Sequence, residues 1–192
     1  MAYLDEIQLK EMGFKSVGEN VKISDKASFY GCDNISIGNN VRIDDFCVFS
    51  AGEGGIDIHD YIHIAVYSSI IGKGKVTISD YANISSRVSI YSSNDDYSGN
   101  YMSNPVVPSE YTNIHSGTVF IGKHVIIGCG SIVLPDVILH EGAAIGALSV
   151  VKEDCEAFTV NVGIPAKPIS ERSKKLLELE SVFKPSDIGD NL

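Results

Sequence analysis

Two adjacent carboxylates, Asp95 and Asp96, open a polar segment near the middle of the 192-residue chain. A carboxylate can hold a cationic group and can accept a proton, so the pair could supply a general base. Asp95 is the first candidate for this base and Asp96 is the alternative. His115, near the end of the segment, is the reserve base, because histidine exchanges protons near neutral pH. Equally, aspartates often do no more than cap a turn.

Polar and aromatic residues surround these acids. The candidates for binding an acceptor molecule are Asn83, Ser85, Ser86, Arg87, Tyr91, Asn94 and Tyr97. We expect Asn83 to point outward because it follows an inward Ala82, and we expect the ANISSR run to lie near the same cleft as Asp95. An outward asparagine is about as often a turn residue as a ligand. Rings that can stack on a nucleotide base, or pack the segment onto a neighbour, belong to Tyr97, Tyr101 and Tyr111.

The elements that position these residues repeat every six residues. Aliphatic residues recur six apart at Ile121, Ile127, Val133, Leu139, Ile145 and Val151. Small or β-branched residues follow four positions after each, at Val125, Ser131, Val137, Ala143, Ser149 and Cys155. Helices repeat near 3.6 residues and strands at 2, so this period predicts the hexapeptide repeat of an all-β parallel β-helix, in which stacked coils share one core. A β-sandwich with chance spacing would not give six consecutive matches.

The same period predicts the organisation of the chain as a single domain, residues 1–192. We expect an N-terminal capping segment over 1–20 with a helix over 3–12, and about six coils over 21–160. The segment 161–192 is expected to contain a helix over 170–180 and an acidic tail over 181–192. A long inserted loop, 92–118, lacks the period. Loops of this length in compact domains are usually functional, and we expect this one to reach a neighbouring subunit.

Four motifs in order give the chain a recognisable likeness. They are IGKHVIIG (121–128), SIVLP (131–135), IGALSVV (145–151) and GIPAK (163–167). This series resembles the hexapeptide-repeat acyltransferases, and the likeness extends from about Val21 to about Glu171. Members of that family are left-handed β-helix enzymes that use acetyl-CoA. The resemblance therefore implies a left-handed coil and acetyl-CoA as co-substrate.

The resemblance also implies where the cofactor binds. In the family, three subunits pack around a threefold axis and acetyl-CoA lies between neighbours, which implies a homotrimer with sites between subunits. The backbone of the late coils would then pair with coenzyme A at Cys129, Gly130, Ala147, Leu148, Ser149 and Gly163. Lys167, with Lys152 or Arg172 as further candidates, would meet the phosphates as a cation. The alternative for Lys167 is a solvated surface lysine.

One departure from the family concerns the base. Many members place a histidine just after the strand that precedes the long loop, and Asp95 stands at that position here. A hydroxyl acceptor needs an efficient base, whereas an amine is nucleophilic once neutral. Asp95 therefore favours an amino-sugar acceptor, and the run from Asn83 to Gly99 also resembles N-acetyltransferases that act on nucleotide-linked amino sugars.

The resemblance thus implies an acetyl-CoA-dependent N-acetyltransferase acting on a nucleotide-linked amino deoxysugar, in surface polysaccharide (O-antigen) synthesis. Two alternatives stay open. One is a sugar O-acetyltransferase of the galactoside type, which would use histidine where Asp95 stands. The other is a non-catalytic β-helical scaffold, which would show outward Ser or Thr ladders and no interrupting loop.

Composition limits the partners. The net charge of −10 and a pI near 4.8 argue against nucleic acid or an anionic membrane as a partner. No stretch approaches the ~20 apolar residues of a membrane span, and the N-terminus does not read as a signal peptide. Four cysteines without metal spacing fit a cytoplasmic protein with reduced thiols. His59 and His63 have the spacing of a helical zinc pair, but they fall on a coil, so we expect no metal.

Overall fold

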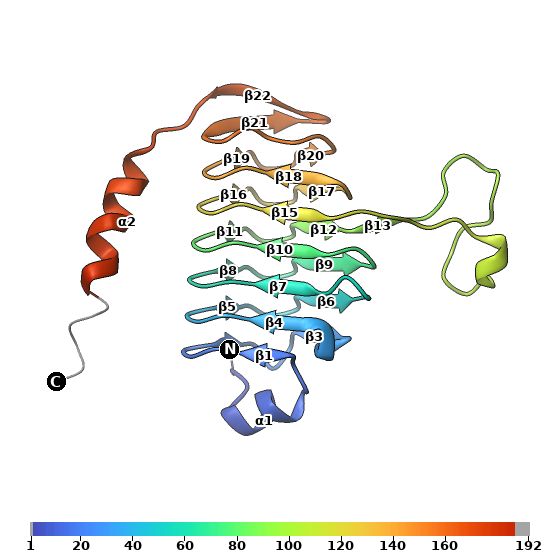
Figure 1. Cartoon of the computed structure of the whole chain (residues 1–192), viewed down its shortest axis with the longest axis horizontal. Helices are drawn as coiled ribbons and strands as arrows, with labels where there is room; N and C mark the ends of the chain where they lie inside the picture. The colour runs from blue at the N-terminus through green and yellow to red at the C-terminus, as the bar shows by residue number, and fades with distance from the viewer. Residues whose placement is uncertain (1, 187–192) are drawn as a thin grey trace.

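The computed structural model describes residues 2–186 as a prism of stacked coils (Figure 1). Each coil contains three short strands, and equivalent strands of successive coils pair in parallel to build three sheets. The fold is a left-handed parallel β-helix, so the predicted fold class is confirmed. No coil can bury its own core, and each therefore depends on the coils above and below it.

The three sheets are named I, II and III in the order in which the chain visits them. Sheet I contains β1 (Ser16–Val17), β4 (Ile35–Ile37), β7 (Ile56–Ile58), β10 (Val76–Ile78), β15 (Val119–Ile121) and β18 (Val137–Leu139). Sheet II contains β2 (Lys22–Ile23), β5 (Arg42–Ile43), β8 (His63–Ile64), β11 (Asn83–Ile84), β16 (Ile126–Ile127), β19 (Ala144–Ile145), β21 (Thr159–Gly163) and β22 (Ala166–Glu171). Sheet III contains β3 (Ser28–Tyr30), β6 (Val48–Ala51), β9 (Ser69–Gly72), β12 (Ser89–Tyr91), β17 (Ile132–Val133) and β20 (Val150–Val151).

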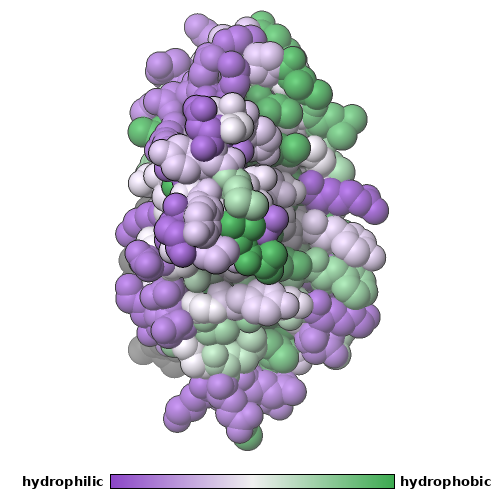
Figure 2. Space-filling view, turned by 90° about the vertical axis from the view of Figure 1, so that its right-hand side faces the viewer, coloured by the Kyte–Doolittle hydropathy of each residue, from purple (hydrophilic) through white to green (hydrophobic). Residues whose placement is uncertain are grey.

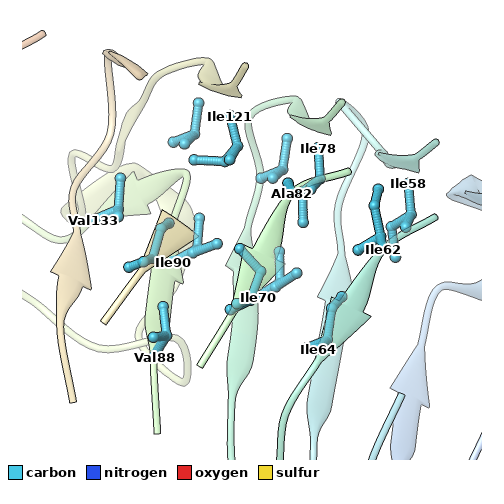
Figure 3. Packing of buried hydrophobic residues seen from close by; sticks show 14 of the residues in the cluster. Ile58, Ile62, Ile64, Ile70, Ile78, Ala82, Val88, Ile90, Ile121 and Val133 are labelled. Carbon is cyan, nitrogen blue, oxygen red and sulfur yellow. The ribbon is translucent and has the colours of Figure 1, made fainter. Parts of the chain in front are cut away.

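The core consists of the inward residues of the repeat. All six aliphatic positions from Ile121 to Val151 are at most 3% exposed, and the six small positions are at most 4% exposed. Figure 3 shows Ile58, Ile78 and Ile121 following one another along the stack, in agreement with their pairing in register. Burying an isoleucine contributes about 1.5–3 kcal/mol relative to leaving it exposed, so this column is the main source of stability.

The N-terminal helix is shorter than predicted. α1 spans Glu6–Glu11, not 3–12, because Asp5 is its N-cap: the Asp5 carboxylate accepts from the Gln8 backbone N–H, and the Gln8 side chain accepts from the Asp5 N–H, both at 2.9 Å. Tyr3 instead forms a bridge with Ser24 at the edge of the first coil. The capping box thus sets where the helix begins.

The C-terminal segment also differs from the prediction. Residues 170 and 171 belong to β22, which folds back antiparallel on β21 at the end of sheet II. α2 (Lys175–Ser186) then begins five residues later than expected and continues through 181–186, where a tail was predicted. The rest of that predicted tail, 187–192, lies outside the described residues. Neither helix within residues 2–186 is long and apolar enough to cross a bilayer.

Three corners connect the sheets, and each is named here by the sheets it joins. Corner I/II carries an aromatic ladder in which Tyr61 stacks on Tyr81 at 5.2 Å and Tyr81 on His124 at 4.9 Å between ring centroids. α2 packs over this ladder, and Phe183 meets the ring of Tyr61 edge-on at 5.2 Å. The helix therefore covers one corner of the prism (Figure 1).

Charged groups fasten α2 to the same corner. Glu180 accepts from Lys123 Nζ at 2.6 Å and its other oxygen lies 2.8 Å from His124 Nε2. Arg172 donates to the backbone oxygens of His124 and Gly142 at 2.8 and 2.9 Å. Arg172, a further candidate for the coenzyme A phosphates, is thus occupied in holding the C-terminal segment at corner I/II.

Candidate active site

The predicted cofactor residues gather on corner II/III, where sheet II turns into sheet III. Cys129 and Gly130 lie in the turn between β16 and β17, and Ala147 and Leu148 in the equivalent turn one coil later. The Gly130 N–H donates to Ser86 O at 3.0 Å, and the Leu148 N–H donates to Cys129 O at 2.9 Å. The structure therefore stacks these turns into one continuous column.

This column presents unpaired backbone donors. Among residues 2–186, no acceptor faces the N–H of Ser86, Cys129 or Ala147, each of which precedes a residue in the left-handed region. Gly128 lets the next coil approach closely, since an added Cβ would stand 2.5 Å from the Ala147 nitrogen. Backbone N–H groups that end up buried need a partner, so this row is suited to a ligand that carries amide or thioester carbonyls.

The top of the column is formed by the β21–β22 hairpin. The Gly163 N–H donates to the Ser149 hydroxyl at 3.0 Å, which places Gly163 beside the column but leaves its N–H paired. Lys167 is exposed and pairs with Glu153 at 2.8 Å, and this hydrogen bond holds the pKa of Glu153 below its ordinary value. Lys167 is therefore a surface cation at the upper end of corner II/III with Glu153 as its partner, and its expected contact with phosphates stays a prediction.

Three of the predicted acceptor residues lie lower on corner II/III. Ser85, Ser86 and Arg87 form the turn between β11 and β12, directly below Cys129 and Gly130. The Ser85 carbonyl accepts from the Ser68 hydroxyl at 2.9 Å, while the Ser85 hydroxyl has no partner among residues 2–186. Asn83 lies just before this turn on the outward face of sheet II, as expected from the inward Ala82 and Ile84.

The remaining candidates lie on the excursion, residues 92–118, which leaves the prism at corner III/I. Its stem is the antiparallel pair β13 (Ser93–Asn94) and β14 (His115–Ser116), and it contains a short 3-10 turn at Ser109–Tyr111. Figure 1 shows the excursion and α2 on opposite sides of the stack. Asn94 is half-buried in the stem, and Tyr91 is half-buried on sheet III just before it.

The two acids at the start of the excursion are in different states. Asp96 accepts from the N–H groups of Ser98 and Gly99, both at 3.0 Å, and the Ser98 hydroxyl bond holds the pKa of Asp96 below its ordinary value. Asp96 therefore caps a turn. Asp95 is exposed and has no hydrogen bond or ion pair within residues 2–186, and Tyr97 is 92% exposed.

His115 has a partner that the sequence reasoning missed. Its Nε2 lies 2.6 Å from Asp136 Oδ2, on the turn between β17 and β18. The two residues are 21 apart in sequence, which is about one coil, so counting along the repeat would have suggested the contact. The pair ties the stem of the excursion to the coil above it.

Within one chain, Ser85 and Asp95 do not lie in one cleft, and the expected cleft between neighbouring subunits stays a prediction. Ser85 stands on corner II/III, whereas Asp95 follows β13 at corner III/I, and β12 of sheet III runs between them. The physical reason is the repeat itself, because each hexapeptide advances the chain by one corner. Residues that share a corner lie about one full coil apart, which Ser85 and Asp95 do not.

The surface between these two corners is partly apolar. Outward positions of sheet III include the register partners Ile71 and Tyr91, and Ile132 and Val150, all of them half-buried. Figure 2, which faces the excursion, shows apolar surface gathered along one flank of the upper coils and mainly hydrophilic surface on the opposite flank. No grouping of three metal-ligating side chains occurs in the part of the chain that the structure describes.

Comparison with known proteins places this arrangement in a class of enzymes. No protein-family model matches the chain. The chain is 98% identical, over all 192 residues and the whole of the relative, to the dTDP-4-amino-4,6-dideoxy-D-glucose acyltransferase of Escherichia coli. It therefore belongs to the family of β-helical acyltransferases that includes this enzyme, and it is an acyltransferase.

Two further relatives are informative. One is AntD, an N-acyltransferase from Bacillus cereus, whose structure was determined for a serine variant in complex with dTDP-4-amino-4,6-dideoxyglucose and coenzyme A. This structure is 45% identical to the chain, with a TM-score of 0.91 over 96% of this chain and 97% of AntD. Another AntD structure of equal TM-score and identity, covering 97% of this chain and 98% of AntD, contains dTDP and 3-hydroxybutyryl-CoA. A putative lipopolysaccharide biosynthesis O-acetyl transferase of Escherichia coli K12 is 33% identical over 72% of this chain and 69% of its own length.

Proposed function

We propose that this chain transfers an acetyl group from acetyl-CoA to the 4-amino group of dTDP-4-amino-4,6-dideoxyglucose. The observation that carries the proposal is the open column of corner II/III, where unpaired N–H groups stand directly above the free hydroxyl of Ser85. The near-identical relative is named for this acceptor, and AntD binds the same sugar together with coenzyme A. Acetyl is the acyl group implied by the resemblance, and AntD has been crystallised with a longer acyl-CoA.

In this proposal the column binds the acyl donor. The N–H groups of Ala147 and Cys129 donate to the pantetheine amide and the thioester carbonyl, and Lys167 meets the phosphates. Donors fixed on a rigid coil are already oriented toward the oxygen that gains negative charge during attack, which is the usual source of electrostatic stabilisation in acyl transfer. Asn83 and Ser85 orient the amino sugar below them.

The proton balance assigns the base. Asp95 holds the ammonium form of the sugar and accepts one proton, and the neutral amine then attacks the thioester carbon. A carbon–nitrogen bond forms, the carbon–sulfur bond breaks, and the leaving thiolate takes the remaining proton. His115 is the reserve base, but its Nε2 is already engaged by Asp136. Asp96 is occupied by its turn, which makes Asp95 the better candidate.

We further propose that the active site is completed by a second subunit of a homotrimer. Ser85 lies at the end of sheet III where its strands begin, and Asp95 lies at the end where they finish. A neighbouring subunit that packs against the apolar face of this sheet can therefore bring its own excursion onto corner II/III. Exposed apolar side chains on the excursion, among them Tyr97, Met102 and Val106 at 92%, 57% and 89%, support such a contact.

The cellular setting completes the proposal. A product of this kind enters surface polysaccharide synthesis, and one relative is named for lipopolysaccharide biosynthesis. All four cysteines are free, which fits the reducing cytoplasm.

A thiol-release assay tests the function. Acetyl-CoA and 3-hydroxybutyryl-CoA are each offered with dTDP-4-amino-4,6-dideoxyglucose, the corresponding free amino sugar and simple galactosides. We expect release of coenzyme A only with the nucleotide-linked amino sugar and faster turnover of the acetyl donor. Turnover of galactosides in its place would contradict the proposal.

A complementation experiment tests the shared site. Asp95→Asn inactivates the excursion, and Ala147→Trp blocks corner II/III. Each variant alone is expected to be inactive, and co-expressed mixtures are expected to regain activity, because some sites then combine two intact halves. Mixing the Asp95 variant with itself is the control. Failure of the mixture, with mixed trimers verified by two affinity tags, would show that each site comes from one chain.

A further inference from the structure

A cluster of charged side chains lies on the outward face of sheet II, outside the site described so far. Arg42 Nε donates to Asp44 Oδ1 at 2.7 Å, and His63 Nε2 lies 2.9 Å from Asp44 Oδ2. Asp44 is only 7% exposed, whereas the side chains of Arg42 and His63 are 49% and 40% exposed. A buried carboxylate thus fixes the orientation of two solvent-facing groups.

The cluster keeps hydrogen-bonding groups free. Both oxygens of Asp44 are occupied, while the Nη groups of Arg42, which donate, and Nδ1 of His63, which donates only when the ring is protonated, have no partner among residues 2–186. The hydrogen bond that Arg42 donates to Asp44 raises the pKa of Arg42, so the guanidinium remains charged. A guanidinium whose Nε is held in place presents its remaining N–H groups as a fork that matches a phosphate group.

The column that contains the cluster has two cationic side chains, in a chain whose net charge is −10. Lys22 pairs in register with Arg42, and Arg42 with His63, so the three form one outward column. Asp44, the acid within this column, is paired with Arg42, so Lys22 leaves the column with one positive charge in excess. A positive column on an otherwise acidic protein attracts multivalent anions from solution.

The same column leads directly to the proposed acceptor site. His63 is the register partner of Asn83, so Arg42 lies two strand spacings below Asn83, about 10 Å. A hexose that carries an amino group at carbon 4 and a phosphate on its anomeric oxygen is shorter than this, and the long side chain of Arg42 can span the difference. An amine placed beside Asn83 and Ser85 therefore puts the anomeric phosphate within reach of Arg42.

We propose that Arg42 and His63, oriented by Asp44, bind the diphosphate of the nucleotide-linked acceptor. The inference rests on the proposed function, because it takes the acceptor to be an amino sugar joined to a nucleoside diphosphate. Acetyl-CoA then occupies the upper end of corner II/III, with its phosphates near Lys167, and the nucleotide sugar occupies the lower end. The two substrates meet head-on at Ser85.

Replacing the arginine separates this role from a structural one. Arg42→Gln is expected to raise the KM for the dTDP-linked amino sugar by about tenfold or more, with kcat and the KM for acetyl-CoA within twofold of the unchanged protein. The Kd of dTDP alone, measured by calorimetry, is expected to rise by the same factor. Arg42→Lys keeps the charge but lacks the forked N–H groups, so its KM for the amino sugar and its Kd for dTDP are expected to lie between those of the unchanged protein and Arg42→Gln. His63→Gln is expected to raise the KM for the amino sugar severalfold.

A matched control uses another exposed ion pair. Lys75 on sheet I pairs with Asp57 at 2.8 Å and its side chain is 51% exposed, so Lys75→Gln removes one positive charge on a different face. This variant is expected to leave both KM values and the dTDP affinity unchanged. If Arg42 had only a structural role, Arg42→Gln would lower the unfolding temperature of the protein without changing its affinity for dTDP, and that result overturns the inference.

Two other outcomes also decide the matter. A loss confined to the KM for acetyl-CoA would assign the cluster to the donor phosphates and overturn the inference. Absence of turnover in the unchanged protein would refute the proposed function, while its dTDP affinity and the effect of Arg42→Gln on that affinity would still test the cluster. Should Arg42→Gln fail to fold, the Kd values of Arg42→Lys and His63→Gln decide, and unchanged values for both refute the role.

Discussion

Corners I/II and II/III are built from the same local structure, but the first is covered by α2 and the second is exposed to solvent. Both stack residues of the left-handed region from coil to coil, with Tyr61, Tyr81 and His124 on the first corner and Tyr67, Arg87 and Leu148 on the second. At corner I/II, α2 covers the rings, and Glu180 on this helix pairs with Lys123 and His124. At corner II/III, Tyr67 and Leu148 are 50% and 72% exposed.

The difference separates stability from function. A covered ladder with paired charges is what a chain needs to hold its C-terminal helix in place. An uncovered ladder beside unpaired N–H groups leaves hydrogen bonds unused, which a protein tolerates where a ligand or another subunit supplies the partner. The comparison therefore supports the proposal that substrates bind at the open corner, while the closed corner holds the C-terminal helix.

The largest expected effect falls on the excursion that must reach the open corner. Asp95→Asn removes the proposed base, and we expect kcat to fall by about 10²–10⁴-fold while the Kd of coenzyme A stays unchanged. Asp96→Asn, the adjacent control, should lower kcat far less because its carboxylate caps a turn. Steady-state kinetics with calorimetry of coenzyme A measure both. Equal losses in the two variants would remove the distinction between the acids.

At the closed corner the expected effect is on stability. Glu180→Gln removes the carboxylate charge that both Lys123 and His124 contact. We expect the free energy of unfolding to fall by about 1–3 kcal/mol, because the side chains of Glu180 and His124 are only 9% and 11% exposed. Glu153→Gln, at an exposed pair, should leave stability unchanged. Denaturant unfolding gives both values. A loss of kcat in Glu180→Gln with intact stability would break the contrast between the corners.

Cysteine labelling can locate the donor on the open corner. Cys129 is exposed on that corner, while burial raises the pKa of Cys32 at corner III/I and raises the pKa of Cys47 and Cys155 to about 11. We expect iodoacetamide to modify Cys129 first, and saturating acetyl-CoA to slow this about tenfold. The slower modification of Cys32 should not respond to acetyl-CoA. Peptide mass spectrometry follows each site, and unprotected Cys129 would place the donor elsewhere.

A smaller effect is expected from removing one backbone donor. Ala147 precedes Leu148, which is left-handed at φ 56°, and proline is favoured at the equivalent position of type II turns. Ala147→Pro therefore should fold normally yet lose one N–H, which raises the KM for acetyl-CoA by about 3–10-fold. Kinetics and a melting curve test this, with Ala147→Ser as the variant that keeps the donor. An unchanged KM for the proline variant would mean that this N–H is not used.

The fold was predictable because its period is contained in the sequence. Ile121, Ile127 and Val133 recur six apart and are all fully buried, so one repeat unit defines the whole core. The ends of the stack were less predictable. α1 begins where Asp5 caps it, and α2 is held in place by the contact of Glu180 with Lys123, two residues that are 57 apart in sequence. Such distant partners leave no periodic signal.

Candidate site residues could be named from the sequence, but their arrangement could not. The structure brings Cys129 and Ala147, proposed for the cofactor, and Ser85, proposed for the acceptor, to one corner, and their roles stay predictions. Asp95 lies on another, and the periodic spacing contained this information, since a shared corner requires a separation of about one coil. The Asp44 cluster was missed because no single hexapeptide contains both Asp44 and His63, which are 19 residues apart.

The unpaired N–H groups of corner II/III have an evolutionary consequence. A donor that belongs to the backbone is the same in every amino acid except proline, so selection at Ser86, Cys129 and Ala147 acts on the shape of the turn more than on the side chain. In the proposed function, these positions can exchange among residues that are small enough to leave the corner open, which excludes both proline and a side chain as large as tryptophan at position 147. Enzymes of this kind can therefore retain one acyl donor while their sequences diverge and their acceptors change.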